Sequence, residues 1–581
     1  MSQGNVMNLA PRGHGSARSW GFYVGILVLI VGPLLQIATS GVEQLGRANF
    51  WFGLYGWLAA AIVIGYLVSL IQARVAPQAE PEPAVSSAAA LPVGASVEAG
   101  ELPAWEVAEL PAPPRFGLAA ALALIGPGAI LLGTSIGSGE WLIGPAVTAR
   151  FGGALLWIAT ASVILQVIMN MEFVRYTMYT GEPVYTGFMR TKPGSTFWSW
   201  VYAVLAFLQL GWPGWALASA TAIAAAFLGR IPGDADANFV KVIGLLCFLS
   251  TVLIVMSGSK IERTMERVQW FFIVAILLFL IVIGVAFTSP DTWGTVASGF
   301  VSFGAFPAGV DWVLLGGFAA YAGAGGVING AISNWFRDKG FGMGGVVGYI
   351  PALIGGQKVP LTHEGKVFPT TQENMRRWNE WWKFAGADQY GLWVIGCFLG
   401  MALPALLTIQ FIPPGTQIEG FGVAAFQAEY LSRVWGGAMW FITLLVGFWI
   451  LYSTQLGITD AFVRMVTDMI WTGSSRVRGW RGGDVRIIYY SVMAIFTLWG
   501  IVILLSGLRP LFLILLGANM AGLNFVFLGL HTLYINHKFL PRELQPARWR
   551  TVVVLLAVVF FGFFFSQALP RMIDQIRETY F

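Results

Sequence analysis

The residue pattern best suited to chemistry is a carboxylate placed directly after a break in an apolar helix. The stretch 126–157 reads GPGAILLGTSIGSGEWLIGPAVTARFGGALLW, where Gly137, Ser138 and Gly139 interrupt the apolar run and Glu140 follows. A broken helix in lipid is tolerated only where its freed backbone groups are buried in protein or line a cavity. An ionisable residue at that depth usually marks a functional site. The stretch therefore predicts a binding site near the membrane midplane; the competing interpretation is a packing kink with Glu140 turned toward the far interface.

A second glycine-rich stretch, in the apolar run 312–336, is the predicted partner of this break. Four glycines fall within eight residues there, and each weakens a helix by about 1 kcal/mol. Small residues also serve close helix packing in membranes, so the stretch alone leaves both interpretations open. It lies five spans after the first break, as expected when two inverted repeats each contribute one discontinuous helix. The predicted site comprises Gly137, Ser138, Gly139, Glu140, Tyr321, Ala322, Gly323, Gly325, Gly326 and Asn329, with Asp460 and Asn519 as secondary candidates.

The remaining polar residues of the apolar spans are interpreted first as structural. Asp460 and Arg464 are spaced as an i,i+4 ion pair, and Asn519 can hydrogen-bond to a neighbouring helix. His363-Glu364 lacks the second histidine of H-E-x-x-H, and the sequence contains no Walker A motif. We therefore expect neither an enzyme nor an ATP-driven pump, and we expect no cofactor.

Composition places the chain in a membrane. Of its 581 residues 56% are hydrophobic and only 11% charged, with a mean hydropathy of +0.70, which is typical of a multi-pass membrane protein. The net charge of +5 comes from basic residues that cluster in loops on one side, so it does not indicate a nucleic-acid partner. The lipid bilayer is the expected partner, and the sequence is also compatible with a homo-oligomer.

Changes in composition divide the chain into three parts. Residues 1–75 hold two apolar spans, 76–115 form a Pro/Ala/Glu-rich linker predicted to be disordered or extended, and 116–572 hold eleven further spans. If the N-terminus lies on the cytoplasmic side of the cell membrane, the predicted inside loops hold 24 of the 34 Lys and Arg residues and the outside loops 8. This bias agrees with the positive-inside rule. The insert 337–389 is then cytoplasmic. Its tryptophan-rich piece, 373–384, is predicted to lie as a helix in the inner interface.

Several stretches, collinear over residues 116–570, resemble the Nramp family of divalent-metal transporters. They are GPG at 126–128 with AVTARFGGALLW at 146–157, and the segments 205–232, 258–268, 444–466 and 535–544. The resemblance implies an all-α protein with the leucine-transporter fold, which has ten core helices in 5+5 inverted repeats, here followed by one more. The two N-terminal spans and the linker lie outside the resemblance.

The metal-binding residues of that family do not carry over. Its Asp-Pro-Gly-Asn motif falls on 137–140, so that Gly137 replaces the aspartate and Glu140 the asparagine, and its Met-Pro-His motif falls on the glycine stretch 321–326. The third-span carboxylate falls near 211–214 and is also missing. An all-oxygen site of this kind favours a hard divalent cation, Mg²⁺ or Mn²⁺ rather than Fe²⁺. The Gly-x-Gly break also resembles amino acid–polyamine–organocation transporters, so an organic-solute transporter is the first alternative and a non-transporting sensor the second.

Overall fold

The computed structural model describes residues 92–580 apart from 257–260, 349–363, 419–422, 475–476 and 478–483. The predicted two-span module, 1–75, and the first part of the linker, 76–91, therefore lie outside the described residues. The chain divides into two compact units, Ala90–Met572 and a second formed by Met1–Ala89 with Ile573–Phe581. The fold and the sites below belong to the first unit.

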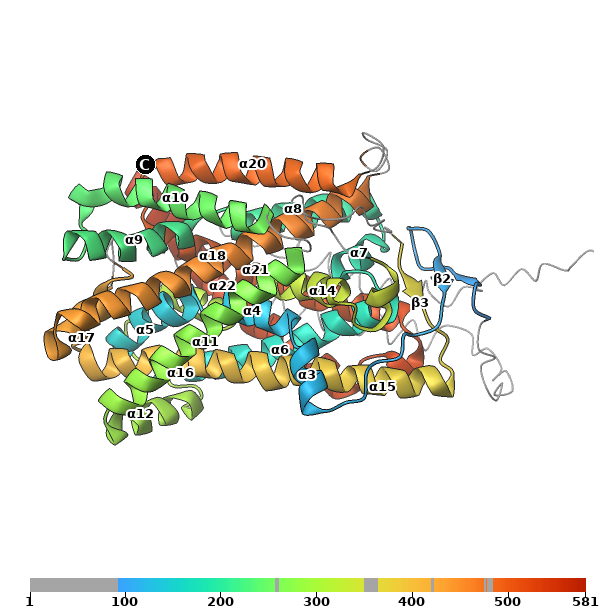
Figure 1. The fold of residues 1–581 in the computed structure, drawn as a ribbon, viewed down its shortest axis with the longest axis horizontal. Helices are drawn as coiled ribbons and strands as arrows, with labels where there is room; N and C mark the ends of the chain where they lie inside the picture. The colour runs from blue at the N-terminus through green and yellow to red at the C-terminus, as the bar shows by residue number, and fades with distance from the viewer. Residues whose placement is uncertain are drawn as a thin grey trace, which may run out of the picture. The chain divides into compact units, whose positions relative to one another are not determined.

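Within the described ranges, nine helices are long and apolar enough to cross a membrane (Figure 1). They are α6 (Trp157–Thr180), α8 (Ser195–Leu210) continued by α9 (Gly214–Leu228), α10 (Ala237–Met256), α11 (Ile261–Phe287), α15 (Gln372–Gly386) continued into α16 (Ile395–Phe411), α18 (Gly437–Gly473), α20 (Val485–Leu505), α21 (Pro510–Phe539) and α22 (Arg548–Tyr580). Shorter helices connect them: α7 (Val184–Met189), α12 (Pro290–Val301), α17 (Phe426–Trp435), η3 (Asp234–Asp236), η4 (Gly342–Val346) and η8 (Arg542–Leu544). The protein is a multi-pass membrane protein.

Two further apolar segments are interrupted where the sequence predicts. The first consists of α3 (Leu118–Leu124), α4 (Pro127–Ser135), the π-helical turn η2 (Gly139–Ile143) and α5 (Gly144–Phe151). The second consists of α13 (Trp312–Tyr321) and α14 (Val327–Lys339). At 1.5 Å per residue, the ten residues of α13 cover about 15 Å, half of the roughly 30 Å hydrocarbon core. Each interrupted segment can therefore cross a bilayer only as two pieces.

The tryptophan-rich helix does not lie apart from the membrane spans. It is α15 (Gln372–Gly386), which continues through the π-helical η5 (Ala387–Val394) into α16 (Ile395–Phe411) as one 40-residue helix (Figure 1). The helix predicted for 373–384 is thus present, and Trp378 and Trp381 are buried against the protein. Its location at the inner interface stays a prediction. A helix of this length measures about 60 Å, twice the hydrocarbon thickness. Its first half therefore extends beyond the lipid core.

The linker is predicted to be disordered or extended. Its described part, 92–115, is ordered and includes two short extended strands, so of the two alternatives disorder is wrong there. β1 (Ser96–Val97) pairs antiparallel with β2 (Trp105–Val107), and β2 pairs parallel with β3 (Lys366–Val367). This sheet, in the order β1-β2-β3, is an exception to the expected all-α fold. Trp105 and Leu110 are buried. Burial of their apolar side chains stabilises the docked conformation, and the average Pro/Ala/Glu-rich composition of the linker did not indicate this. We call residues 92–115 the docked segment.

Candidate functional site

The two helix breaks lie directly against each other. A Cβ atom on Gly139 would lie 1.9 Å from the carbonyl oxygen of Tyr321, at the end of α13. A Cβ atom on Gly137 would lie 2.0 Å from Oγ1 of Thr454 on α18. Since both distances are far below van der Waals contact, only glycine fits at these two positions. The break in the first segment is thereby held between the second break and α18.

A small cavity lies where the breaks meet. Its lining comes from both interrupted segments, from α9 and from α18: Thr134, Ser135, Ser138, Gly139, Trp215, Tyr321, Gly323, Ala324, Ile328, Thr454 and Ile458. Four of the predicted site residues are in this lining: Ser138, Gly139, Tyr321 and Gly323. The cavity measures about 10 Å³, roughly what one water molecule requires. In this state the site is closed to anything larger.

Trp215 is a lining residue that the sequence analysis missed. Its indole Nε1 donates a hydrogen bond of 2.9 Å to Oγ of Ser138, and its ring lies 5.9 Å from that of Tyr321. The residue follows the Gly-Trp-Pro-Gly sequence at 211–214, where the chain passes from α8 to α9. A tryptophan next to such a kink was the available signal.

Glu140 is buried at the first break and is not part of the cavity lining. The side chain is 1% exposed, and Oε2 accepts a hydrogen bond of 3.0 Å from the backbone N–H of Gly137. Oε1 has no hydrogen-bond partner of good geometry among the described residues. The interpretation that Glu140 turns toward the far interface is therefore wrong.

The second break is held by two glutamines that the sequence analysis did not select. Gln166 of α6 donates from Nε2 to the carbonyl of Ala322 at 3.0 Å, and its Oε1 accepts from the N–H of Ala324 at 3.1 Å. Gln209 of α8 donates to the carbonyl of Gly325 at 2.9 Å and accepts from the N–H of Val327 at 3.0 Å. These amides supply the partners that the interrupted helix lacks. The sequence signal for both was a glutamine in the middle of an apolar helix.

The remaining predicted residues have structural contacts. Asn329 donates from Nδ2 to Oε1 of Gln166 at 3.1 Å and to Oδ1 of Asn170 at 2.8 Å. Gly323, Gly325 and Gly326 have φ angles of 122°, 89° and 50°, which side chains rarely tolerate. The carbonyl of Ala322 accepts the hydrogen bond from Gln166 that helps to hold the second break. Asn519 donates to the carbonyl of Val313 at 3.0 Å, which confirms its predicted contact with a neighbouring helix.

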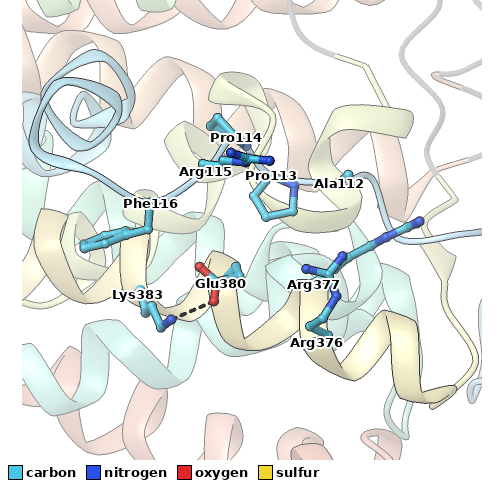
Figure 2. Close-up of a pocket in the computed structure, with 9 residues that line it drawn as sticks. All are labelled: Ala112, Pro113, Pro114, Arg115, Phe116, Arg376, Arg377, Glu380 and Lys383. Atoms are coloured by element: carbon cyan, nitrogen blue, oxygen red, sulfur yellow. Dashed lines mark hydrogen bonds and ion pairs between the residues drawn. The ribbon is translucent and has the colours of Figure 1, made fainter.

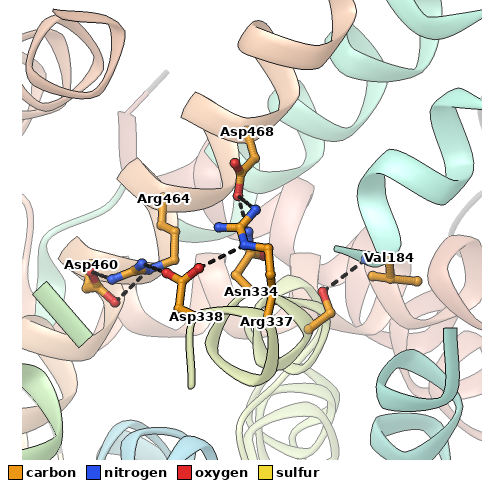
Figure 3. A network of polar contacts seen from close by, with 8 residues as sticks. Val184, Asn334, Arg337, Asp338, Asp460, Arg464 and Asp468 are labelled. Atoms are coloured by element: carbon orange, nitrogen blue, oxygen red, sulfur yellow. Dashed lines mark hydrogen bonds and ion pairs between the residues drawn. The ribbon is translucent and has the colours of Figure 1, made fainter. Parts of the chain in front are cut away.

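The predicted ion pair of Asp460 with Arg464 is present at 2.7 Å and belongs to a larger buried network (Figure 3). Arg464 also pairs with Asp338 of α14, and Arg337 pairs with Asp338 at 2.8 Å and with Asp468 at 3.1 Å. The network therefore joins α14, the second half of the interrupted segment, to α18. Asp460 lies in this network and is not part of the cavity lining.

Comparison with known proteins gives a result at the level of structure. No protein-family model and no curated protein matches the sequence. A crystal structure of the Eremococcus coleocola manganese transporter, determined on a point variant, matches over 82% of this chain and 92% of that chain, with a TM-score of 0.56 and 15% identity. The same transporter in complex with an aromatic bis-isothiourea substituted compound matches over 81% and 90%, with a TM-score of 0.54 and 14% identity. The two proteins share a fold. At this identity the likeness concerns the fold alone.

Proposed function

We propose that this protein is a secondary transporter that moves a divalent cation, Mg²⁺ or Mn²⁺ rather than Fe²⁺, by alternating access at the two breaks. The cavity lining offers the hydroxyls of Thr134, Ser135, Ser138 and Thr454 together with backbone groups, and no thiol or thioether. Hard cations prefer oxygen ligands of this kind. The shared fold with a manganese transporter supports transport as the activity.

The observation that carries this proposal is the state of the Glu140 carboxylate. It is buried, it accepts a hydrogen bond from the N–H of Gly137 at the first break, and its Oε1 lacks a close donor. A buried carboxylate oxygen without a partner is costly, and a cation or its bound water would supply the missing partner. Mg²⁺ gives up its water reluctantly, and the present cavity is too small for a hydrated ion. Binding therefore requires the two breaks to separate.

The contacts at the first break argue against the organic-solute alternative. A substrate carboxylate would need free backbone N–H groups at 137–139. The N–H of Gly137 is already bonded to Glu140, so the substrate would have to displace a residue of the same charge. The cation proposal needs no such exchange.

The finer architecture belongs to the same proposal. We place the two breaks in equivalent positions of two inverted five-span repeats, with the N-terminus and the insert 337–389 in the cytoplasm. The two-span module 1–75 and the linker then precede the transporter core 116–572. The separation of five spans between the breaks supports this arrangement.

Replacing Glu140 by glutamine tests the proposal. Glu140→Gln keeps the size of the side chain and its bond to Gly137 but removes the charge that offsets a dication. Losing a buried counter-charge costs about 3–5 kcal/mol, so we expect Mg²⁺ or Mn²⁺ affinity to fall by about 100-fold or more. Isothermal titration of purified protein, with uptake into liposomes for a panel of divalent ions and amino acids, provides the measurement.

The control is Glu429→Gln on α17, a carboxylate paired with Arg433 near the surface. It should leave affinity and uptake unchanged. If Glu140→Gln binds the cation as tightly as the wild type, Glu140 is structural and the proposal is wrong. Uptake of amino acids without any divalent ion by the wild type would refute it as well.

A further inference from the structure

A pocket of about 370 Å³ lies between the end of the docked segment and α15 (Figure 2). The end of the docked segment and the residue after it contribute the run Ala112–Phe116, and α15 contributes Arg376, Arg377, Glu380 and Lys383. Its volume falls in the range typical of small-ligand sites. The lining shares no residue with the cavity at the helix breaks.

The pocket is strongly cationic. Its lining carries Arg115, Arg376, Arg377 and Lys383 against one carboxylate, Glu380. Arg115 is exposed and has no ion-pair partner among the described residues. Lys383 pairs with Glu380 at 2.6 Å. Arg376 and Arg377 share the carboxylate of Glu373, which lies outside the lining.

The existing ion pairs of these cations are weak competitors for a ligand. Arg376 and Arg377 both bond to Glu373, at 2.8 Å and 2.9 Å, and Glu109 lies 3.8 Å from Arg377. The Arg376 side chain is 67% exposed and the Glu373 side chain 47%. Exposed pairs of this kind contribute little to stability, so the Arg376 guanidinium can turn to an incoming anion at small cost. Arg377 is only 25% exposed and also donates to the carbonyl of Leu110 at 2.7 Å, so it stays where it is.

Exposed apolar side chains adjoin this cationic lining. Phe116 is 47% exposed and Leu118, the first residue of α3, is 78% exposed. The Phe116 ring packs edge-on against Phe384 of α15, with 5.0 Å between centroids. Since the second half of the α15–α16 helix crosses the hydrocarbon core, this part of α15 lies near the level of the lipid headgroups. The surface thus offers cations beside apolar groups at the membrane boundary.

We propose that this pocket binds the phosphate headgroup of an anionic phospholipid, whose acyl chains lie along Phe116 and Leu118. Basic pockets at a membrane boundary recognise such headgroups through charge and hydrogen bonds. A guanidinium group can donate two parallel hydrogen bonds to two oxygens of one phosphate. A soluble phosphate would use the same cations. The exposed apolar residues favour the lipid, because a soluble ion gives them no function. The proposal does not depend on what the transporter carries.

Native mass spectrometry of the full-length protein in detergent tests this site. Dioleoylphosphatidylglycerol and dioleoylphosphatidylcholine have the same acyl chains, so their difference in retention isolates the headgroup charge. We expect the wild type to retain phosphatidylglycerol preferentially. The triple variant Arg115→Gln/Arg376→Gln/Lys383→Gln should lose about tenfold or more of this retention.

The matched control is Arg230→Gln/Arg433→Gln/Arg509→Gln. These three arginines are 57%, 61% and 56% exposed, each is paired with a carboxylate, and all lie in segments predicted to face outside. The control should retain phosphatidylglycerol as the wild type does. Unchanged phosphatidylcholine retention and thermal unfolding temperature in both triple variants would show that they are folded.

Leu118→Ser separates the lipid from a soluble anion. It leaves every cation in place and should still lower phosphatidylglycerol retention. Equal retention of the two lipids by the wild type, or unchanged retention by the pocket variant, would overturn the proposal. Displacement of phosphatidylglycerol by excess glycerol phosphate, with Leu118→Ser behaving as the wild type, would identify a soluble phosphate as the ligand and also overturn it.

Discussion

The ion pair of Arg190 with Glu182 should control whether the docked segment stays on the protein. Glu182, in the connection between α6 and α7, is buried. It accepts hydrogen bonds from Nε1 of Trp105 at 3.0 Å, from the hydroxyl of Tyr176 at 2.7 Å and from the N–H of Gly365 at 2.7 Å. Nε of Arg190 donates to the same carboxylate at 2.8 Å. One carboxylate thus joins the docked segment, the end of α6 and the approach to β3.

Arg190 completes this attachment from the other side. It donates to the carbonyls of Ala99 at 3.1 Å and Pro103 at 2.8 Å. Its guanidinium lies 4.6 Å from the centre of the Trp105 ring, within the range of a cation–π interaction. Replacing Arg190 therefore removes the counter-charge of Glu182 and two bonds to the docked segment together.

The expected cost follows from these contacts. Arg190→Met leaves Glu182 buried as an uncompensated charge, which costs about 3–5 kcal/mol, and it also loses a cation–π contact of about 1 kcal/mol. We expect local stability of the docked segment to fall by about 4 kcal/mol. In Glu182→Gln/Arg190→Met no charge is left buried. The amide oxygen can accept from Trp105 and Gly365, which share Oε1, and the amide NH2 can donate to the Tyr176 hydroxyl at the other position. That double variant should lose only about 1–2 kcal/mol.

Hydrogen exchange measured by mass spectrometry reports directly how often the docked segment opens. The N–H of Val107 bonds to Ala95 at 2.7 Å and that of Ala108 to Val367 at 2.9 Å, so both amides exchange only when the sheet opens. A loss of 4 kcal/mol corresponds to exchange about 1,000-fold faster in Arg190→Met, against about tenfold in the double variant. Peptides from α21 serve as the internal control. Exchange in the double variant as fast as in Arg190→Met would refute the reasoning.

The pH dependence has a definite sign. Burial raises the pKa of Glu182, but the Arg190 charge and the hydrogen bonds outweigh it, so the pKa is lowered overall. A carboxylate with a lowered pKa contributes stability that is fully present above its unfolded value, about 4.3, and is lost as the pH falls through the folded value. After correction for intrinsic exchange, wild-type protection should stay constant from about pH 7 to 5 and decrease only below about 4.3.

Two further predictions concern sheet order and topology. Two double-cysteine variants should form a disulfide under mild oxidation because they join paired positions of neighbouring strands: Glu106→Cys with Lys366→Cys, and Glu106→Cys with Ser96→Cys. The variant Ser96→Cys with Lys366→Cys should form none, since two strand spacings place these positions about 10 Å apart. A disulfide in that last variant alone would disprove the order β1-β2-β3. Cysteines introduced singly at Thr370 and at Ser87, which lies outside the described residues, should resist an impermeant external thiol reagent in intact cells. Labelling of either would disprove the predicted cytoplasmic location.

Features encoded in local sequence could be predicted. Long apolar runs identify membrane helices because a span needs about 20 apolar residues, and clustered glycines identified both breaks because they destabilise a helix wherever they occur. The ion pair of Asp460 with Arg464 depends only on a spacing of four residues within α18. In each case the signal lies inside a single helix.

Features that depend on distant partners could not be predicted. Trp105 stands alone in a Pro-rich stretch, and its hydrogen-bond partner Glu182 lies 77 residues away. The tryptophans of α15 do form one face, but Trp382 lies under the guanidinium groups of Arg175 and Arg550, at 4.4 Å and 5.4 Å. Periodicity predicts an amphipathic face and does not indicate whether lipid or protein covers it.

The contacts at the two breaks differ in charge. Each break frees backbone groups that must be satisfied inside the membrane. At the second break, the amides of Gln166 and Gln209 satisfy them, and an amide pairs with N–H and C=O alike without carrying charge. At the first break, Glu140 bonds to the N–H of Gly137 and brings a carboxylate. A dication entering between the breaks would meet neutral dipoles on one side and a negative charge on the other, so its affinity should depend on Glu140 far more than on either glutamine.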